Sequence, residues 1–494
     1  MEANTSKKVV GNSVIYIFCN MLIKCFGLFL LPLYTAHLTP ADYGVTNIAN
    51  HFISIMGFVG AFSLYSAIMR FYVDLKDDSQ KLKRFYGTVI SFCGISCVAF
   101  GLIFYLCRAV LEKYIFIGIP FYPVIFVTLI SVFFSCQHTV YENILRSQQK
   151  AFKSSVLSIA YFLLTVALNI YFVVTLKLGA VGVLMATAIS GGAYTAFFIV
   201  DMLIHKEMCF CIDINLLKSA LKYSIPIIPH NLSTHIATFV SSVLIGGTNT
   251  FAALGVYSVA RQFGNVADGI QSSVNQAIAP WMYEKMHEGN SGEKKSIRNT
   301  INITCAIIGV FFLGIALFSH DYVVLFLDGE YSEAWIYIAA IVLMYAAKTI
   351  YYFFVNILFY NKKASNKVFV ASLSNSLVNV LASAVLIPYI GAYGAILAEL
   401  IGILIQIIIV IAMSRSFNDI GLRVRDFIGH VLMVCVFTVV GLLFTFTNYS
   451  TTFSLWDFLY RGLVLIVYIV INLFRYRSSI KGFIKVFIRR RSGT

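Results

Sequence analysis

The chain has 494 residues, of which 59% are hydrophobic and 12% are charged. This composition lies far from that of soluble globular proteins, and it excludes a chain that folds in water around an ordinary core. The formal net charge of +15 could suggest a nucleic-acid partner, but the basic residues are dispersed over short segments between apolar runs. We therefore expect these residues to orient the protein in a membrane and to contact anionic head groups, with no nucleic-acid partner.

Fourteen apolar runs follow one another along the chain, each near the roughly 20 residues that a helix needs to cross a bilayer. The runs are 9–33, 45–69, 85–107, 116–140, 156–176, 181–204, 223–245, 252–277, 301–318, 335–359, 368–387, 393–413, 427–447 and 458–474. Their apolar residues are continuous rather than alternating, which argues against the strands of a membrane barrel. The predicted fold class is an all-α integral membrane protein with 14 transmembrane helices.

Basic residues avoid every second gap between these runs. Most of the 37 Lys and Arg residues precede the first run, follow the last, or occupy gaps after even-numbered runs. Because basic residues near the ends of spans stay on the cytoplasmic side, we expect both termini to be cytoplasmic.

The chain also repeats itself at a distance of about 211 residues. The segment Gly44–Ala49 matches Gly255–Ala260, and Leu178–Ala186 matches Ile390–Ala398 at nearly the same offset. Chance similarity between apolar segments is the alternative to duplication. Six runs precede the second copy, so duplication predicts a parallel repeat: two six-helix lobes that face each other across a central cavity. The predicted parts are an N-lobe (1–204), a cytoplasmic amphipathic linker (205–222), a C-lobe (223–413), two accessory helices (414–474) and a basic amphipathic tail (475–494).

Three motifs resemble those of polysaccharide-transport proteins, the oligosaccharide-lipid flippases of the multidrug/oligosaccharidyl-lipid/polysaccharide exporter superfamily. Leu38–Gly44 reads LTPADYG and resembles the family's L-x-P-x-D-Y-G signature. Leu217–Pro229 resembles its lobe-joining segment, and Ile387–Ala395 resembles its I-P-x-x-G-x-x-G-A element. These motifs are structural signatures, so they assign no role in transport to a particular residue.

The resemblance implies a V-shaped pair of lobes in the bacterial cytoplasmic (inner) membrane. Such a protein flips an undecaprenyl-diphosphate-linked oligosaccharide for O-antigen, capsule or exopolysaccharide from the inner to the outer leaflet. Its expected partners are this cargo, membrane lipids and, as candidates, glycan polymerase or assembly proteins; we expect a monomer. The alternatives are a lipid II flippase, a drug or cation antiporter of the same superfamily and, from a different class, a polytopic glycosyltransferase or polymerase.

Catalysis is not expected from this sequence. The longest outer loop spans only about 319–333, which leaves little room for a catalytic site, and no G-x-x-x-x-G-K-[ST] phosphate loop occurs. We expect no resident cofactor and no metal, with a coupling proton or sodium ion as the one candidate ligand besides the cargo.

Three cations lie inside apolar runs, where ionisable groups normally face a bundle interior or a water-filled cavity. Lys24, Arg261 and Lys348 are therefore the candidate residues of a basic cavity for the diphosphate. Tyr351 and Tyr352 beside Lys348 are candidates for stacking on sugar rings. The alternative is structural neutralisation, in which Arg261 pairs with Asp268 and Lys348 with Glu399.

The acids deepest in the runs are Asp268 and Glu399, and either could bind a coupling proton or cation. An internal salt bridge is the competing interpretation for each. Glu142, Arg146 and Asp201 lie near the cytoplasmic ends of their runs, where we expect ordinary boundary charges.

Overall fold

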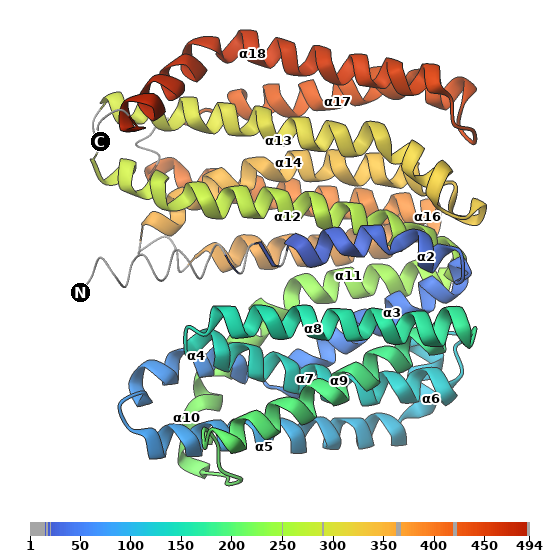
Figure 1. The fold of residues 1–494 in the computed structure, drawn as a ribbon, viewed down its shortest axis with the longest axis vertical. Helices are drawn as coiled ribbons and strands as arrows, with labels where there is room; N and C mark the ends of the chain where they lie inside the picture. Colours follow the sequence, from blue (N-terminus) through green and yellow to red (C-terminus); the bar gives the residue numbers. More distant parts are fainter. Residues whose placement is uncertain are drawn as a thin grey trace. The chain divides into compact units, whose positions relative to one another are not determined.

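The computed structural model describes residues 15, 18–19, 21–248, 250–288, 291–361, 367–417 and 422–491, and describes no side chains beyond Arg477. All regular elements in these residues are helical (Figure 1). The chain divides into two compact units. The first runs to Phe26 and includes Leu33–Ser258 and Ser383–Ala395; the second comprises Gly27–Pro32, Val259–Ala382 and the chain from Ile396 onward. The predicted lobe boundaries stay a prediction.

The first unit is organised around α7, which packs against α3, α4, α5 and α9. Its core is formed by buried side chains of these helices, including Tyr86, Val89, Tyr141 and Phe198. The helices of this unit are α3 (Pro40–Gly60), α4 (Leu64–Leu75), α5 (Ser79–Leu106), α7 (Phe126–Ser147), α8 (Ala151–Asn169), α9 (Gly179–Ile204), α10 (Ile214–Ser224) and α11 (Ile228–Thr248), with the three-residue α6 (Arg108–Val110) between α5 and α7 and the start of α12 at the end of the unit.

The second unit is organised around α13, which packs against α14, α17 and α18. Its helices are the main part of α12 (Phe251–Glu288), α13 (Ser291–Phe326), α14 (Ala334–Tyr360), the two ends of α16 (Val368–Ser414), α17 (Val424–Asn448) and α18 (Leu455–Arg491). The accessory pair α17 and α18 therefore belongs to this unit. The predicted tail, 475–494, is helical as far as Arg491 and continues α18 without a break.

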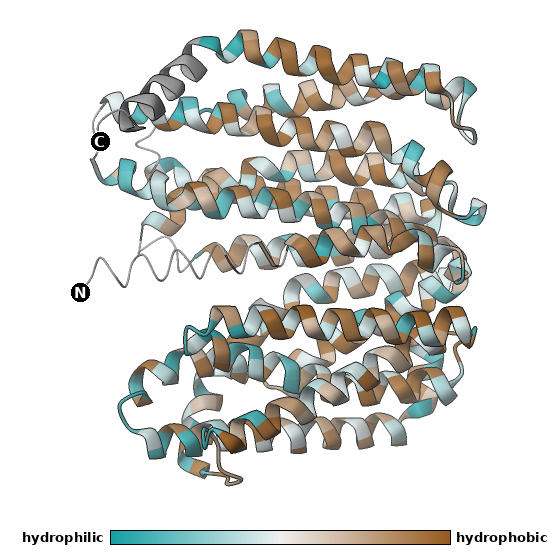
Figure 2. Cartoon of the chain, viewed as in Figure 1, coloured by the Kyte–Doolittle hydropathy of each residue, from teal (hydrophilic) through white to brown (hydrophobic). Residues whose placement is uncertain are grey.

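Many large apolar side chains point outward, as they must in a protein surrounded by lipid. Leu102, Leu163 and Leu443 are more than half exposed although they lie inside long helices. Figure 2 shows hydrophobic residues along whole helices, while hydrophilic residues gather toward many helix ends. In lipid such surfaces need no cover, whereas every backbone polar group must be satisfied inside the helix. The chain is a multi-pass membrane protein.

Nine helices in the described part of the chain are long and apolar enough to cross a membrane, and α3 with α4 forms a further, bent candidate. The bend of 44° falls at Ala61–Ser63, where Phe62 and Ser63 have positive φ angles. The helix α16 extends over two of the predicted runs, and its backbone leaves helical geometry at Ile390 and Gly391. The total of fourteen spans stays a prediction.

The LTPADYG segment is a helix start that also joins two helices. Thr39 is the N-cap of α3 and forms a capping box with Asp42, while Pro40 occupies the first turn, where no hydrogen bond is lost. The other carboxylate oxygen of Asp42 accepts a hydrogen bond from the backbone N–H of Ala180 at 3.2 Å, in the first turn of α9. One carboxylate thus stabilises two positive helix ends.

The glycine that ends this segment lies at a close contact between α3 and the start of α12. A Cβ atom at Gly44 would overlap the carbonyl oxygen of Phe251, and one at Gly255 would overlap that of Pro40. Gly44 corresponds to Gly255 in the sequence repeat, and Pro40 corresponds to Phe251 at the same offset. The contact is therefore reciprocal, as between two copies of one surface related by a twofold axis.

A second pair of repeat-related glycines shares a positive φ angle. Gly179 has a φ of +56° and Gly391 a φ of +57°, which L-residues with a side chain rarely adopt. Gly179 is the first residue of α9, and Gly391 lies at the break in α16.

The linker between the predicted lobes packs onto the first unit. Met208 and Ala220 are buried in its core, and α10 lies against α4 and α5. Thr88 accepts a hydrogen bond from the backbone N–H of Asp213 at 2.9 Å, just before α10 begins. The segment is thus a docked element rather than a free tether.

Candidate functional site

The helix α12 carries polar side chains that lipid cannot accommodate. Within the second unit, Gln262, Asn265 and Gln276 on this helix are exposed. Amide groups in hydrocarbon would lack hydrogen-bond partners, so a buried or water-lined environment is required wherever α12 crosses the membrane. α12 is accordingly absent from the helices that are apolar enough to be candidate spans in the described residues.

Arg261 on α12 forms an ion pair with Glu399 on α16. Its Nη1 lies 2.5 Å from Oε2 of Glu399, and the two side chains are only 15% and 20% exposed. A short, charge-assisted hydrogen bond of this kind is among the strong polar contacts. Arg261 is therefore neutralised in this structure.

A second ion pair joins α14 to α12. Lys348 Nζ lies 2.9 Å from Oδ1 of Asp268, and the hydroxyl of Tyr352 donates to the same oxygen at 3.2 Å. The ammonium group also lies over the rings of Tyr345, at 5.1 Å from the centroid, and Tyr352, at 5.6 Å. Both contacts are cation–π interactions, which stabilise a desolvated charge.

The sequence suggested the exchanged pairs, Arg261 with Asp268 and Lys348 with Glu399, as the structural alternative. Arg261 and Asp268 share a face of α12, but the ion pairs form between helices instead. Lys348 lies over the ring of Tyr345, and Arg261 and Asp268 share a face of α12, so we treat the two pairs as one cluster. We call Arg261, Lys348, Asp268 and Glu399 the four-charge cluster; its formal charge is zero.

A row of uncharged polar contacts extends from this cluster along α12 and α14. Gln271 donates to the hydroxyl of Thr349 at 2.6 Å, and Asn356 donates to Asn275 at 2.8 Å. Sequence reasoning missed these residues because it considered only charged and aromatic side chains. The sequence did contain a pattern that could have indicated them, since Gln271 and Asn275 are four residues apart and therefore share a face of α12.

Lys24 lies in the first unit, on the apolar helix Met21–Thr35, and its side chain is exposed. Arg261 and Lys348 lie in the second unit. A single basic cavity to which Lys24 also contributes stays a prediction.

The acids near the predicted cytoplasmic surface are not ordinary boundary charges, contrary to expectation. Glu142 on α7 is buried and accepts hydrogen bonds from the hydroxyls of Ser154 and Ser158, each at 3.0 Å. Asp201 on α9 pairs with Lys153 at 2.7 Å and accepts from Tyr141 at 2.6 Å. Both carboxylates link helices of the first unit, which apolar periodicity could not reveal.

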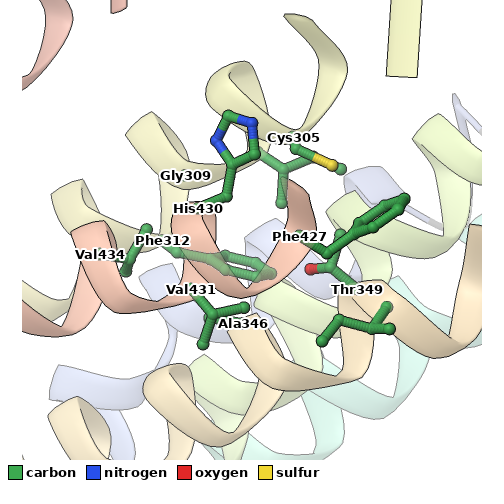
Figure 3. A pocket seen from close by; sticks show the side chains of 11 residues that line it. Cys305, Gly309, Phe312, Ala346, Thr349, Phe427, His430, Val431 and Val434 are labelled. Carbon is green, nitrogen blue, oxygen red and sulfur yellow. The ribbon is translucent and has the colours of Figure 1, made fainter. Parts of the chain in front are cut away.

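A small cavity lies in the second unit between α13, α14 and α17 (Figure 3). Its volume is about 20 Å³, and Cys305, Gly309, Thr349 and His430 are among the residues that line it. A space of this size is enough for about one water molecule. It is too small for a glycan or a diphosphate.

The family described as polysaccharide biosynthesis protein matches residues 9–286, which is more than half of the chain. The chain belongs to the polysaccharide biosynthesis protein family. It is thus a transporter of the multidrug/oligosaccharidyl-lipid/polysaccharide exporter superfamily rather than an enzyme.

Solved structures share this fold at low sequence identity. A structure titled lipid II flippase MurJ, inward closed conformation, has a TM-score of 0.71 and 15% identity, covering 95% of this chain and 100% of that one. A structure of MATE in complex with MaD3S has a TM-score of 0.55 and 16% identity, covering 87% of this chain and 96% of that one. A mutant of the Vibrio cholerae MATE transporter VcmN has a TM-score of 0.52 and 18% identity, covering 85% of this chain and 99% of that one. No curated protein matches the chain.

Proposed function

We propose that this member of the polysaccharide biosynthesis protein family flips an undecaprenyl-diphosphate-linked oligosaccharide across the bacterial cytoplasmic membrane by alternating access. The observation that carries the proposal is the four-charge cluster. Two cations are held among tyrosine side chains on helices that also carry amides, which is chemistry suited to a diphosphate with attached sugars.

In the mechanism that we propose, the diphosphate competes with Asp268 and Glu399 for Lys348 and Arg261. Arg261 offers a planar fork that can bind two phosphate oxygens at once, while Lys348 acts as a point charge. When a carboxylate loses its partner, a proton or sodium ion can neutralise it. Export of negative charge is favoured by the membrane potential by about 2.3 kcal/mol per charge per 100 mV when the cell interior is negative.

The proposed architecture is the predicted one, with fourteen spans and two parallel six-helix lobes around a central cavity. Two features support the duplication: the reciprocal contact of Gly44 with the Gly255 segment, and the shared positive φ of Gly179 and Gly391. In this architecture both termini are cytoplasmic, and Lys24 adds a third cation to the cavity.

The test is transport by purified protein in liposomes, with a fluorescent undecaprenyl-diphosphate oligosaccharide in the inner leaflet. We expect the probe to appear in the outer leaflet with unchanged mass, which separates transport from glycosyl transfer. Arg261→Ala and the double variant Lys24→Ala/Arg261→Ala should lower this rate at least tenfold, with normal membrane insertion. Normal transport by the double variant would contradict a role in the cavity.

A matched control removes a similar ion pair elsewhere. Lys153→Ala breaks the pair with Asp201 in the first unit, and we expect it to affect stability more than the transport rate per folded molecule. Lipid II and a cationic drug serve as competing substrates. If the protein moved either of them faster than every oligosaccharide probe, that molecule would be the cargo instead.

A further inference from the structure

A second cluster of charges is buried where the accessory helix α18 meets α13. The Arg461 side chain is fully buried, with its Nη2 2.7 Å from Oδ1 of Asp321 and 3.1 Å from Oδ2 of Asp457. Its Nη1 donates to the carbonyl of Leu317 at 2.8 Å, and its Nε donates to the carbonyl of Asp457 at 3.3 Å. Each nitrogen of the guanidinium group therefore has a protein partner.

One cation faces two carboxylates in this cluster. The side chains of Asp321 and Asp457 are only 7% and 1% exposed. Among the described residues, Oδ2 of Asp321 and Oδ1 of Asp457 have no hydrogen-bond partner. If both acids are ionised, one negative charge stays uncompensated away from water, which is strongly unfavourable. With both acids ionised, the cluster is thus one positive charge short.

His320 is placed to supply that charge. Its ring is fully buried, and its Nε2 lies 3.3 Å from the carbonyl oxygen of Ser450. A carbonyl oxygen only accepts hydrogen bonds, so this contact assigns the ring hydrogen to Nε2. The other nitrogen, Nδ1, lies 3.8 Å from Oδ1 of Asp321 and has no hydrogen-bond partner in the described part of the chain. In the neutral ring, its lone pair would face a carboxylate.

We propose that His320 is a proton-binding residue, and that a proton on its Nδ1 completes a neutral cluster with Arg461, Asp321 and Asp457. Imidazolium and guanidinium then balance the two carboxylates. The proton strengthens the junction between α13 and the α17–α18 pair, because the cluster joins these helices. This role is independent of the proposed cargo, since the cluster shares no residue with the four-charge cluster.

Neighbouring elements add contacts but no further charge in the interactions that the structure records. From α17, the hydroxyl of Thr445 donates to Oδ2 of Asp457 at 2.7 Å. From α14, the ring of Trp335 meets His320 edge-on, with centroids 5.1 Å apart. Ser450 lies in the turn between α17 and α18, so the cluster is close to one end of this hairpin. The cluster therefore lies toward the side of the membrane that the basic residues predict to be the outer one.

The sign of the pH dependence follows from this charge count. When His320 is protonated, the cluster is neutral and the junction is most stable; as pH rises and the proton leaves, one buried negative charge is left. The wild-type protein should therefore lose stability with rising pH through this cluster. His320→Gln carries the extra negative charge at every pH and should resemble the wild type at high pH.

The experiment is thermal unfolding of the full-length protein in detergent, between about pH 5 and pH 8, the range in which histidine titrates. We expect the wild type to unfold several degrees above His320→Gln at the acidic end, with the difference shrinking as pH rises. Asp321→Asn should remove this pH dependence, because one carboxylate then balances Arg461. His205→Gln, at an exposed histidine that contacts Asp201, is the control for general effects of losing a histidine.

The double variant keeps the proposal testable even if His320→Gln does not fold. His320→Gln/Asp321→Asn has a balanced cluster and should be more stable than His320→Gln alone. A double variant no more stable than the single one would overturn the proposal, as would a pH-independent difference between wild type and His320→Gln. Stabilisation by sodium instead of acid, retained in His320→Gln, would also overturn it in favour of a metal cation.

Discussion

Gly44 and Gly255 each occupy a position where the backbone of a neighbouring helix leaves no room for a side chain, and each lies against the segment that precedes the other. Gly44 meets the carbonyl of Phe251, and Gly255 meets the carbonyl of Pro40. Small residues at helix contacts let backbones approach closely, which is a principal source of packing in membranes. The contact is also the most direct structural trace of the sequence repeat.

We predict that Gly255→Ala and Gly44→Ala each destabilise the protein by at least about 1–3 kcal/mol, because the new methyl group overlaps backbone rather than a movable side chain. Thermal unfolding in detergent measures this effect. Gly101→Ala in α5 is the control, since a Cβ there meets nothing within 4 Å. Equal stability of Gly255→Ala and Gly101→Ala would show that the close approach is absent.

Asp42→Asn should weaken the junction of α3 and α9 by about 1–2 kcal/mol, because it removes a charge that faces two helix ends. Asp42→Ala should be worse, since it also removes the hydrogen bonds to Thr39 and to the Ala180 N–H. The measurement is hydrogen exchange of the first turns of both helices. Faster exchange in α3 alone would contradict the bridging role.

The carboxyl group of Asp78, which lies outside the membrane-spanning segments, should make the stability of the start of α5 slightly dependent on pH. Asp78 is the N-cap of α5, and hydrogen bonding from the backbone N–H of Lys81 holds the pKa of its carboxyl below the usual value. A carboxyl whose pKa is lowered by folding contributes stability above its unfolded pKa and loses it as pH falls through the folded pKa. Relative to the intrinsic exchange rate at each pH, the protection of the amides at the start of α5 should therefore fall at acidic pH, and Asp78→Asn should show a weaker pH response.

Lys348→Ala should destabilise the protein by about 1–3 kcal/mol, because Asp268 loses its partner in a largely buried environment. Lys348→Ala/Asp268→Asn removes both charges, so it should recover much of that stability. Transport by the double variant should stay low if Lys348 binds the diphosphate. Recovery of stability and transport together would show that the ion pair is only structural.

Gly391→Ala should cost about 1–3 kcal/mol, since its φ of +57° and ψ of −135° are accessible almost only to glycine. The break in α16 then cannot form without strain. Thermal unfolding checks the stability, and the same assay on Gly314→Ala, where a Cβ meets nothing within 4 Å, supplies the control. Full stability of Gly391→Ala would mean that the break adopts another geometry.

The sequence by itself determined that this is a helical membrane protein, because lipid requires long apolar helices, and its motifs indicated the family to which the chain belongs. It also identified Arg261, Lys348, Asp268 and Glu399 as the notable charges of their helices, because each is costly in an apolar run. Only the tertiary structure decided which charges pair, since pairing depends on how α12, α14 and α16 pack. Likewise, neither the buried partners of Glu142 nor the meeting of His320, Asp321 and Arg461 is encoded in local periodicity. These contacts join residues far apart in the chain, and helix packing alone brings them together.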